Sequence, residues 1–135
     1  MSSVSIQSVS RTFEGRKGQR TQALLPVDFE VRDNDFVTIL GPSGCGKSTL
    51  LRIVAGLDHA TSGRVLLDGV PVEGPGADGG MVFQSYTLFP WLTIEQNIRF
   101  GLRERGMPET LQKERAAYFI AKVGLRGFEQ HFPKQ

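Results

Sequence analysis

The sequence has little of several residue types that define common protein classes, with one cysteine, one tryptophan and two histidines in 135 residues. Cys45 alone cannot form an internal disulfide, and no neighbouring residues complete a zinc site, so a disulfide scaffold and a structural zinc domain are excluded. The apolar runs are far shorter than the ~20 residues of a membrane-spanning helix. The polar start, residues 1–5, lacks the basic and apolar regions of a signal peptide. We therefore expect a cytoplasmic chain.

An excess of charge of one sign is also missing. The 16 Lys and Arg residues against 14 Asp and Glu leave a net charge of +2, and the charges are spread evenly over both halves of the chain. No basic arm for nucleic acid is present, so we expect no nucleic-acid partner. The 39% hydrophobic and 22% charged residues are typical of a folded globular domain and exclude a disordered chain.

The first half of the chain reads as strands followed by one helix. Residues 27–32 alternate apolar and charged side chains, and we expect residues 3–32 to form an antiparallel pair joined through a polar loop. Residues 36–40 are apolar almost throughout, which predicts a strand covered on both faces, as in a parallel sheet. A helix is expected from Lys47, with Gly56 as its C-terminal stop.

The second half reads as short strands followed by helices. Residues 65–72 predict a hairpin whose tight turn is Asp68-Gly69, and residues 81–83 predict another short strand. A helix is expected from Thr93, and the Gly106-Met107-Pro108 segment should end it. A longer helix is predicted over residues 109–123, with an apolar stripe formed by Leu111, Ala116, Phe119, Ile120 and Val123.

One motif carries chemistry. It satisfies G-x-x-x-x-G-K-[ST] and consists of Gly41, Pro42, Ser43, Gly44, Cys45, Gly46, Lys47, Ser48 and Thr49. Glycines let the backbone wrap a phosphate, so that N–H groups and the positive end of the following helix hold the anion. Lys47 would place its charge on the β and γ phosphates, and the Ser48 hydroxyl would be a ligand of Mg²⁺. The motif thus predicts a site for a chain of phosphates with Mg²⁺, between a strand and a helix.

The motif, together with Phe13 upstream and Gln84 after residues 81–83, resembles the ATP-binding subunit of ABC transporters over essentially the whole chain. The segments 74–78 and 88–98 resemble the importer branch for nitrate, sulfonate and taurine-type solutes. The resemblance implies that Phe13 stacks on adenine and that Gln84 contacts Mg²⁺ and the attacking water. Lys47 and Gln84 are thus the expected catalytic residues, and Ser48 and Gln84 the expected metal ligands.

The chain departs from the family at two places. Asn34-Asp35 stands where the family usually has Gly-Glu, and we expect Asn34 to adopt the left-handed turn conformation. Near Gly79-Gly80 a basic residue common in the family is replaced, so we assign no phosphate or partner contact to that loop.

The resemblance implies an α/β fold: a truncated P-loop NTPase core with an N-terminal antiparallel β subdomain and the start of a helical subdomain. Residues 1–135 would be the N-terminal part of the ATP-binding domain, divided into a nucleotide-binding core over 1–89 and a helical start over 90–135. The signature motif, the Walker B strand and the catalytic glutamate would lie beyond residue 135. The strand at 36–40 would then lack its neighbour, and we expect a poorly stable chain.

The implied function is that of an ATP-binding, energy-coupling component of an importer, in which ATP hydrolysis drives solute transport. Its partners would be membrane-embedded permease subunits, a second copy in the complete protein and, indirectly, a periplasmic or extracellular solute-binding protein. The permease subunits would hold it on the inner face of the cell membrane, and the surface that receives them would include Phe89, Trp91 and Leu92. This chain alone would bind ATP without efficient hydrolysis.

Several alternatives stay open on the sequence. The chain can be a non-catalytic nucleotide-binding fragment or another P-loop NTPase, although it has no Asn-Lys-x-Asp guanine motif. Relatives acting on DNA or the ribosome are disfavoured by the near-neutral charge. Phe13 can cap the core of a small sheet, Gln84 can be an ordinary polar residue, and Trp91 with its neighbours can pack into a core.

Overall fold

The computed structural model describes residues 3–15, 18–76, 79–85 and 87–134. The chain divides into two compact units, Met1–Met81 and Val82–Gln135. Each unit has its own secondary structure and its own packed side chains, and each is described by itself below.

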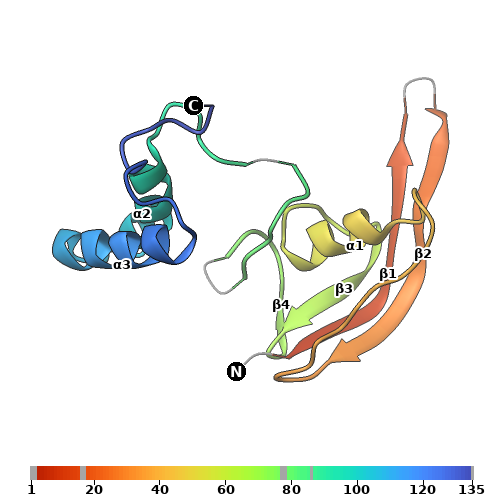
Figure 1. The fold of residues 1–135 in the computed structure, drawn as a ribbon. Helices are drawn as coiled ribbons and strands as arrows, with labels where there is room; N and C mark the ends of the chain where they lie inside the picture. Colours follow the sequence, from red (N-terminus) through yellow and green to blue (C-terminus); the bar gives the residue numbers. More distant parts are fainter. Residues whose placement is uncertain (1–2, 16–17, 77–78, 86, 135) are drawn as a thin grey trace. The chain divides into compact units, whose positions relative to one another are not determined.

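The first unit contains a four-stranded antiparallel sheet in the order β2-β1-β3-β4 (Figure 1). Its strands are β1 (Val4–Glu14), β2 (Arg20–Val31), β3 (Ser62–Leu67) and β4 (Val70–Pro71). The antiparallel pair expected over residues 3–32 and the hairpin expected at 65–72 are confirmed. Asp68 and Gly69 both have positive φ angles, 52° and 80°, which is the backbone conformation that a two-residue hairpin turn requires.

Helix α1 (Lys47–Val54) supplies the other half of the core of the first unit. Leu50 and Ile53 pack with the sheet residues Ile6, Val9, Leu24 and Val65, all of them buried. The helix ends as expected at Gly56, whose φ is 69°. The N–H of Leu57 donates to the Arg52 carbonyl at 2.8 Å and that of Gly56 to the Ile53 carbonyl at 3.0 Å, the paired bonds of a Schellman turn.

An irregularity interrupts the pairing of β1 with β2 near one end of the sheet. Arg11 pairs with Leu24, but the next residue, Thr12, pairs with Gln22, so Ala23 has no partner in the register. An extra residue of this kind is a β-bulge, which bends the strand locally and re-aims nearby groups. The bulge therefore turns the Ala23 backbone away from regular sheet geometry at the point where α1 begins.

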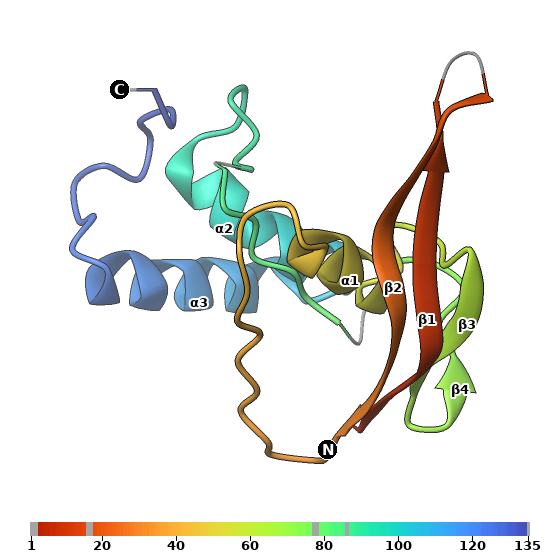
Figure 2. The same ribbon diagram turned by 90° about the vertical axis from the view of Figure 1, so that its right-hand side faces the viewer.

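Two strand predictions were wrong. Residues 36–40 are extended but belong to no sheet, and Phe36 and Leu40 are 94% and 87% exposed (Figure 2). Residues 81–83 form no strand either. Apolar sequence favours a buried strand, but a strand exists only where a second one accepts its hydrogen bonds, and no described segment pairs with these two. The prediction for Asn34 is confirmed, since its φ is 63°.

The second unit is built on helices α2 (Ile94–Glu104) and α3 (Glu109–Lys122), as expected. Thr93 begins α2 with a capping box, since its hydroxyl accepts from the Gln96 N–H and the Gln96 side chain accepts from the Thr93 N–H. The apolar stripe predicted for α3 was partly wrong. Ala116 and Ile120 are buried, but Gln112 shares that face, while Leu111, Phe119 and Val123 are exposed.

Candidate functional site

The glycine-rich segment 41–49, called the P-loop below, has the backbone conformation that its glycines allow. Gly44 and Gly46 have φ angles of 83° and 96°, in the region that residues with a Cβ rarely adopt. A Cβ on Gly46 would overlap the Ala23 carbonyl oxygen and lie 3.1 Å from Leu24 Cδ1. A Cβ on Gly41 would lie 2.8 Å from Cys45 Sγ. The loop is therefore folded tightly against itself and against the bulge in β2.

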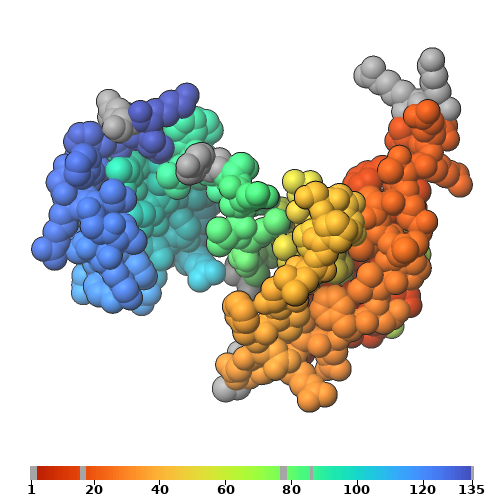
Figure 3. All heavy atoms as spheres, turned by 45° about the vertical axis from the view of Figure 1, so that its right-hand side comes forward, coloured from red at the N-terminus to blue at the C-terminus, as the bar shows by residue number. Residues whose placement is uncertain are grey.

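The start of α1 has the features of an anion site. It has no side-chain cap and no acidic residue in its first turn, so its first N–H groups and the positive end of its dipole are left for another partner. Leu50 N–H donates to the Gly46 carbonyl at 2.9 Å, which makes Gly46 the residue from which the helix starts. Pro42, Ser43 and Gly44 are exposed, and in Figure 3 the segment that leads into α1 lies on the visible surface of the first unit.

Lys47 is held inside this loop. Its Nζ donates to the carbonyls of Gly41 and Pro42, each at 2.7 Å, and lies 3.6 Å from Cys45 Sγ. Two loop carbonyls therefore hold the ammonium group against the P-loop. A single cation held at the positive end of a helix, with no acidic partner in the loop, is an arrangement suited to an anion carrying more than one negative charge.

The hydroxyl residues that follow Lys47 differ in access. Ser48 is exposed, whereas Thr49 is half-buried. Over the described residues no group of three or more His, Cys, Asp or Glu side chains is placed to hold a metal ion. Mg²⁺ bound by an exposed serine together with phosphate oxygens and water needs no such group, because Mg²⁺ usually takes only one or two ligands from the protein. The residues present fit Mg²⁺ that arrives with a nucleotide.

Phe13 lies on the part of the sheet that the P-loop touches. Gly46 packs on Ala23 and Leu24, Leu24 pairs with Arg11, and Phe13 follows two residues later on β1. The Phe13 ring is 41% exposed, so it does not cap the core of the sheet. Phe13 therefore presents an exposed aromatic ring on β1, and its expected contact with adenine stays a prediction.

Gln84 lies near the start of the second unit, in a bend with its side chain exposed. The packing of the first unit does not include it, so its expected place at the phosphates stays a prediction.

The Asp58 carboxylate, which the sequence analysis did not single out, pairs with Arg11 at 2.8 Å in the first unit. The sequence could have indicated that Arg11 lies near Phe13, since the two residues are two positions apart on one strand and so share a face.

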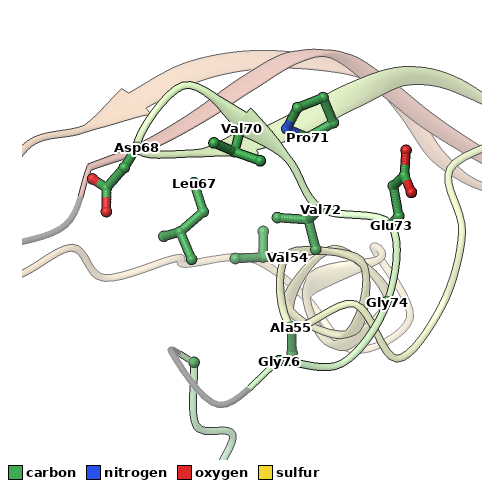
Figure 4. Close-up of a pocket in the computed structure, with 11 residues that line it drawn as sticks. Val54, Ala55, Leu67, Asp68, Val70, Pro71, Val72, Glu73, Gly74 and Gly76 are labelled. Atoms are coloured by element: carbon green, nitrogen blue, oxygen red, sulfur yellow. The ribbon is translucent and has the colours of Figure 1, made fainter.

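A second concave region in the first unit is a groove of about 500 Å³ at the opposite end of α1 (Figure 4). The side chains of Val54, Leu67 and Val72 face one another across it. Its charged lining side chains among the described residues are Asp68 and Glu73, both acidic. An apolar groove with acidic edges repels phosphate, so the P-loop is the better candidate for the anion site.

The second unit presents a well-fixed loop before α2. The Asn97 side chain accepts from the Phe89 N–H at 2.8 Å and donates to the carbonyls of Phe89, Leu92 and Thr93 at 3.0–3.1 Å. Trp91, held in this loop, is 69% exposed. The loop therefore displays a large aromatic side chain on a rigid backbone.

None of the described helices is both long and apolar enough to cross a membrane.

Comparisons with known proteins agree with this geometry. The family model described as ABC transporter matches residues 24–135, which include the whole P-loop. An uncharacterized ABC transporter ATP-binding protein of Methanocaldococcus jannaschii is 52% identical over 130 residues, 96% of this chain and 48% of that protein. The nitrate import ATP-binding protein NrtD of Synechocystis is 45% identical over 96% of this chain and 48% of its own length. The taurine import ATP-binding protein TauB of Burkholderia pseudomallei is 48% identical over 97% of this chain and 50% of its own length.

Solved structures lead to the same family. A dimeric ATP-binding cassette in a post-hydrolysis state with ADP and Pi has a TM-score of 0.84 at 30% identity, covering 98% of this chain and 62% of that one. A second dimeric ABC transporter cassette has a TM-score of 0.85 at 30% identity, with the same coverage. The chain spans about half the length of the curated relatives it matches. With a P-loop against an antiparallel sheet, and with a family model that matches most of its residues, the chain belongs to the ABC transporter family.

Proposed function

We propose that the P-loop binds the phosphates of ATP together with Mg²⁺. The observation that carries the proposal is the start of α1, where positive φ angles at Gly44 and Gly46, an uncapped helix end and the Lys47 ammonium meet at one point. Backbone N–H groups of the loop would hold the β-phosphate, Lys47 the β and γ phosphates, and Ser48 the metal. Bound Mg²⁺ would neutralise charge on the phosphate oxygens.

The activity that we propose for the complete protein is ATP hydrolysis coupled to solute import. The nitrate import and taurine import proteins that this chain resembles at 45% and 48% identity support an importer component. The two dimeric cassettes support association of two copies. Membrane-embedded permease subunits would then be the direct partners on the inner face of the membrane, and a solute-binding protein an indirect one.

We propose that the permease contacts Trp91 and Leu88, which are 69% and 56% exposed. The hydrogen bonds of Asn97 fix the loop that carries Trp91, so this surface does not have to order itself when a partner binds.

We also propose that Gln84 contacts Mg²⁺ and the attacking water.

Among the described residues Gln84 is the only group that we assign to water. The acidic residue that directly follows strand β3, Asp68, lines the groove at the other end of α1 and not the P-loop, so we assign it no role at the metal. We therefore propose that this chain binds Mg-ATP with little turnover.

Titration of the 135-residue chain with Mg-ATP, followed by calorimetry, tests the proposal. Binding should be lost in Lys47→Met and retained in the control Lys113→Met, which removes an exposed lysine of the second unit. Phosphate release from the same samples should stay at background. Equal binding by wild type and Lys47→Met would overturn the P-loop site, and rapid magnesium-dependent phosphate release would overturn the proposal that this chain has little turnover.

A further inference from the structure

Arg11, which pairs on β1 with the Leu24 that Gly46 packs on, makes an unusual set of contacts. Its guanidinium carbon lies 4.6 Å from the centroid of the Phe13 ring, so the planar cation covers one face of that ring. Its Nη2 donates to Asp58 Oδ1 at 2.8 Å, and both side chains are only about one-fifth exposed, 23% and 20%. A cation held this far out of water beside an aromatic ring interacts more strongly with it than an exposed one does.

Asp58 is itself fixed in place. The His59 N–H donates to its Oδ1 at 2.8 Å, and the residue follows directly after the Schellman turn that ends α1. The chain just beyond is tied back to β1, because the Thr12 N–H donates to Thr61 Oγ1 at 2.9 Å and the Thr61 N–H donates to the Ser10 carbonyl at 2.8 Å. The carboxylate therefore holds Arg11 from a rigid position at the exit of the P-loop helix.

The pair is poorly explained as a device for stability alone. The Nε of Arg11 is buried and has no hydrogen-bond partner, which is unfavourable for a guanidinium donor and rare in folded proteins. Glu14 on β1 and Arg20 on β2 form an exposed pair with side chains 71% and 75% accessible, and neither has a buried unpartnered atom. Arg11 thus keeps an unpaired donor while its guanidinium covers one face of Phe13.

The consequence for Phe13 is that one face of its ring is covered and the side chain still remains 41% exposed. A ring held in this way loses little rotamer freedom when a flat ligand stacks on it, and an ordered binding group gains affinity for that reason. We propose that Arg11, held by Asp58, is a positioning residue for the nucleobase: it fixes Phe13 so that a purine stacks on the open part of the ring. The inference rests on the proposed ATP site and on the stacking of adenine on Phe13 that the family resemblance implies, and it adds the role of Arg11 and Asp58.

Competition binding distinguishes the contribution of the base to affinity from that of the phosphates. The 135-residue chain is titrated with ATP and with inorganic triphosphate, both with Mg²⁺, against a fluorescent ATP analogue. Wild type should bind ATP more tightly than triphosphate. Arg11→Met should weaken the affinity for ATP by about tenfold and leave the affinity for triphosphate unchanged. Arg11→Lys keeps the charge but not the planar group, and should recover only part of the loss.

Three further variants make the assignment specific. Asp58→Asn should weaken the binding of ATP and leave that of triphosphate unchanged. Phe13→Ala should weaken ATP binding as strongly as Arg11→Met does. The double variant with Phe13→Ala and Arg11→Met should bind ATP no more weakly than either single variant, because the two side chains act as one unit. Arg20→Met, which breaks only the exposed pair with Glu14, should change nothing. Thermal unfolding of each variant shows whether it is folded at the assay temperature.

The outcomes are distinct. Folded Arg11→Met with wild-type affinity for ATP, or with ATP and triphosphate weakened equally, would overturn the positioning role. If Arg11→Met fails to fold, folded Asp58→Asn with an unchanged ratio of the two affinities would overturn it in the same way. Wild type that binds ATP and triphosphate equally would show that no base is recognised. Wild type that binds neither would instead overturn the proposed ATP site, and this inference with it.

Discussion

Substitution of Gly46 tests how tightly the P-loop is built into the first unit. The residue has a φ of 96°, and a Cβ at this position would overlap the Ala23 carbonyl oxygen, a backbone atom that moves only if β2 moves. A left-handed conformation costs a non-glycine residue about 1–2 kcal/mol. Forcing a methyl group into a packed contact adds about 1–3 kcal/mol. We therefore expect Gly46→Ala to destabilise the first unit by about 2–5 kcal/mol, a large part of the ~5–15 kcal/mol of a typical domain.

Gly44→Ala is the matched control. Gly44 has a similar φ of 83°, but a Cβ there meets no atom within 4 Å, so only the backbone term applies. Both variants change the unfolded chain in the same way, and that contribution cancels in the comparison. The difference between the two variants isolates the contact with Ala23 and should be about 1–3 kcal/mol.

The assay has to report on the first unit. Trp91 is the only tryptophan and lies in the second unit, so its fluorescence follows the wrong part of the chain. Amide hydrogen exchange at the buried Ile6 and Val9 of β1 measures the opening free energy of the first unit directly. Equal losses of protection in Gly46→Ala and Gly44→Ala would refute the packing of the P-loop against the bulge.

Three other perturbations have defined outcomes. Asn97→Ala removes four hydrogen bonds from the loop before α2 and should lower the stability of the second unit by about 1–3 kcal/mol. Trp91 fluorescence during thermal unfolding measures this loss, and an unchanged midpoint would contradict the proposed role of Asn97. The pKa of Glu109 is lowered from 4.5, first by its hydrogen bond with Lys113 and then by Arg99. Its contribution to stability is therefore full above pH 4.5 and is lost as the pH falls through the lower folded pKa, and Glu109→Gln should flatten this dependence in urea unfolding. Replacing both Phe36 and Leu40 by serine should raise solubility, measured by light scattering against concentration, because both side chains are exposed; unchanged scattering would show that this segment does not drive association.

Local signals in the sequence predicted most of the elements. The alternation in residues 27–32, the Asp68-Gly69 turn, the stop at Gly56 and the left-handed Asn34 all depend on a few neighbouring residues, and all are confirmed. The capping box at Thr93 and Gln96 was equally local and was available from its spacing.

Features that depend on distant residues were not predictable in this way. Residues 36–40 have the composition of a buried strand, but whether they form one depends on a pairing partner elsewhere in sequence. The burial of Gln112 on α3 depends on its bonds to Arg99 and to the Met107 carbonyl, which the stripe of apolar residues does not reveal. The candidate site shows the same division, since the P-loop was evident from its motif, whereas the link between Arg11 and Asp58 joins β1 to a residue that is 47 positions away.

The central claim is that the start of α1 receives the phosphates of ATP, and amide chemical-shift mapping tests it most directly. Adding Mg-ATP to the ¹⁵N-labelled chain should move the backbone N–H signals of residues 44–49 most, and adding inorganic triphosphate should move the same signals. Shifts that instead centre on the groove lined by Val54, Leu67 and Val72, or no shifts at saturating nucleotide, would contradict the account.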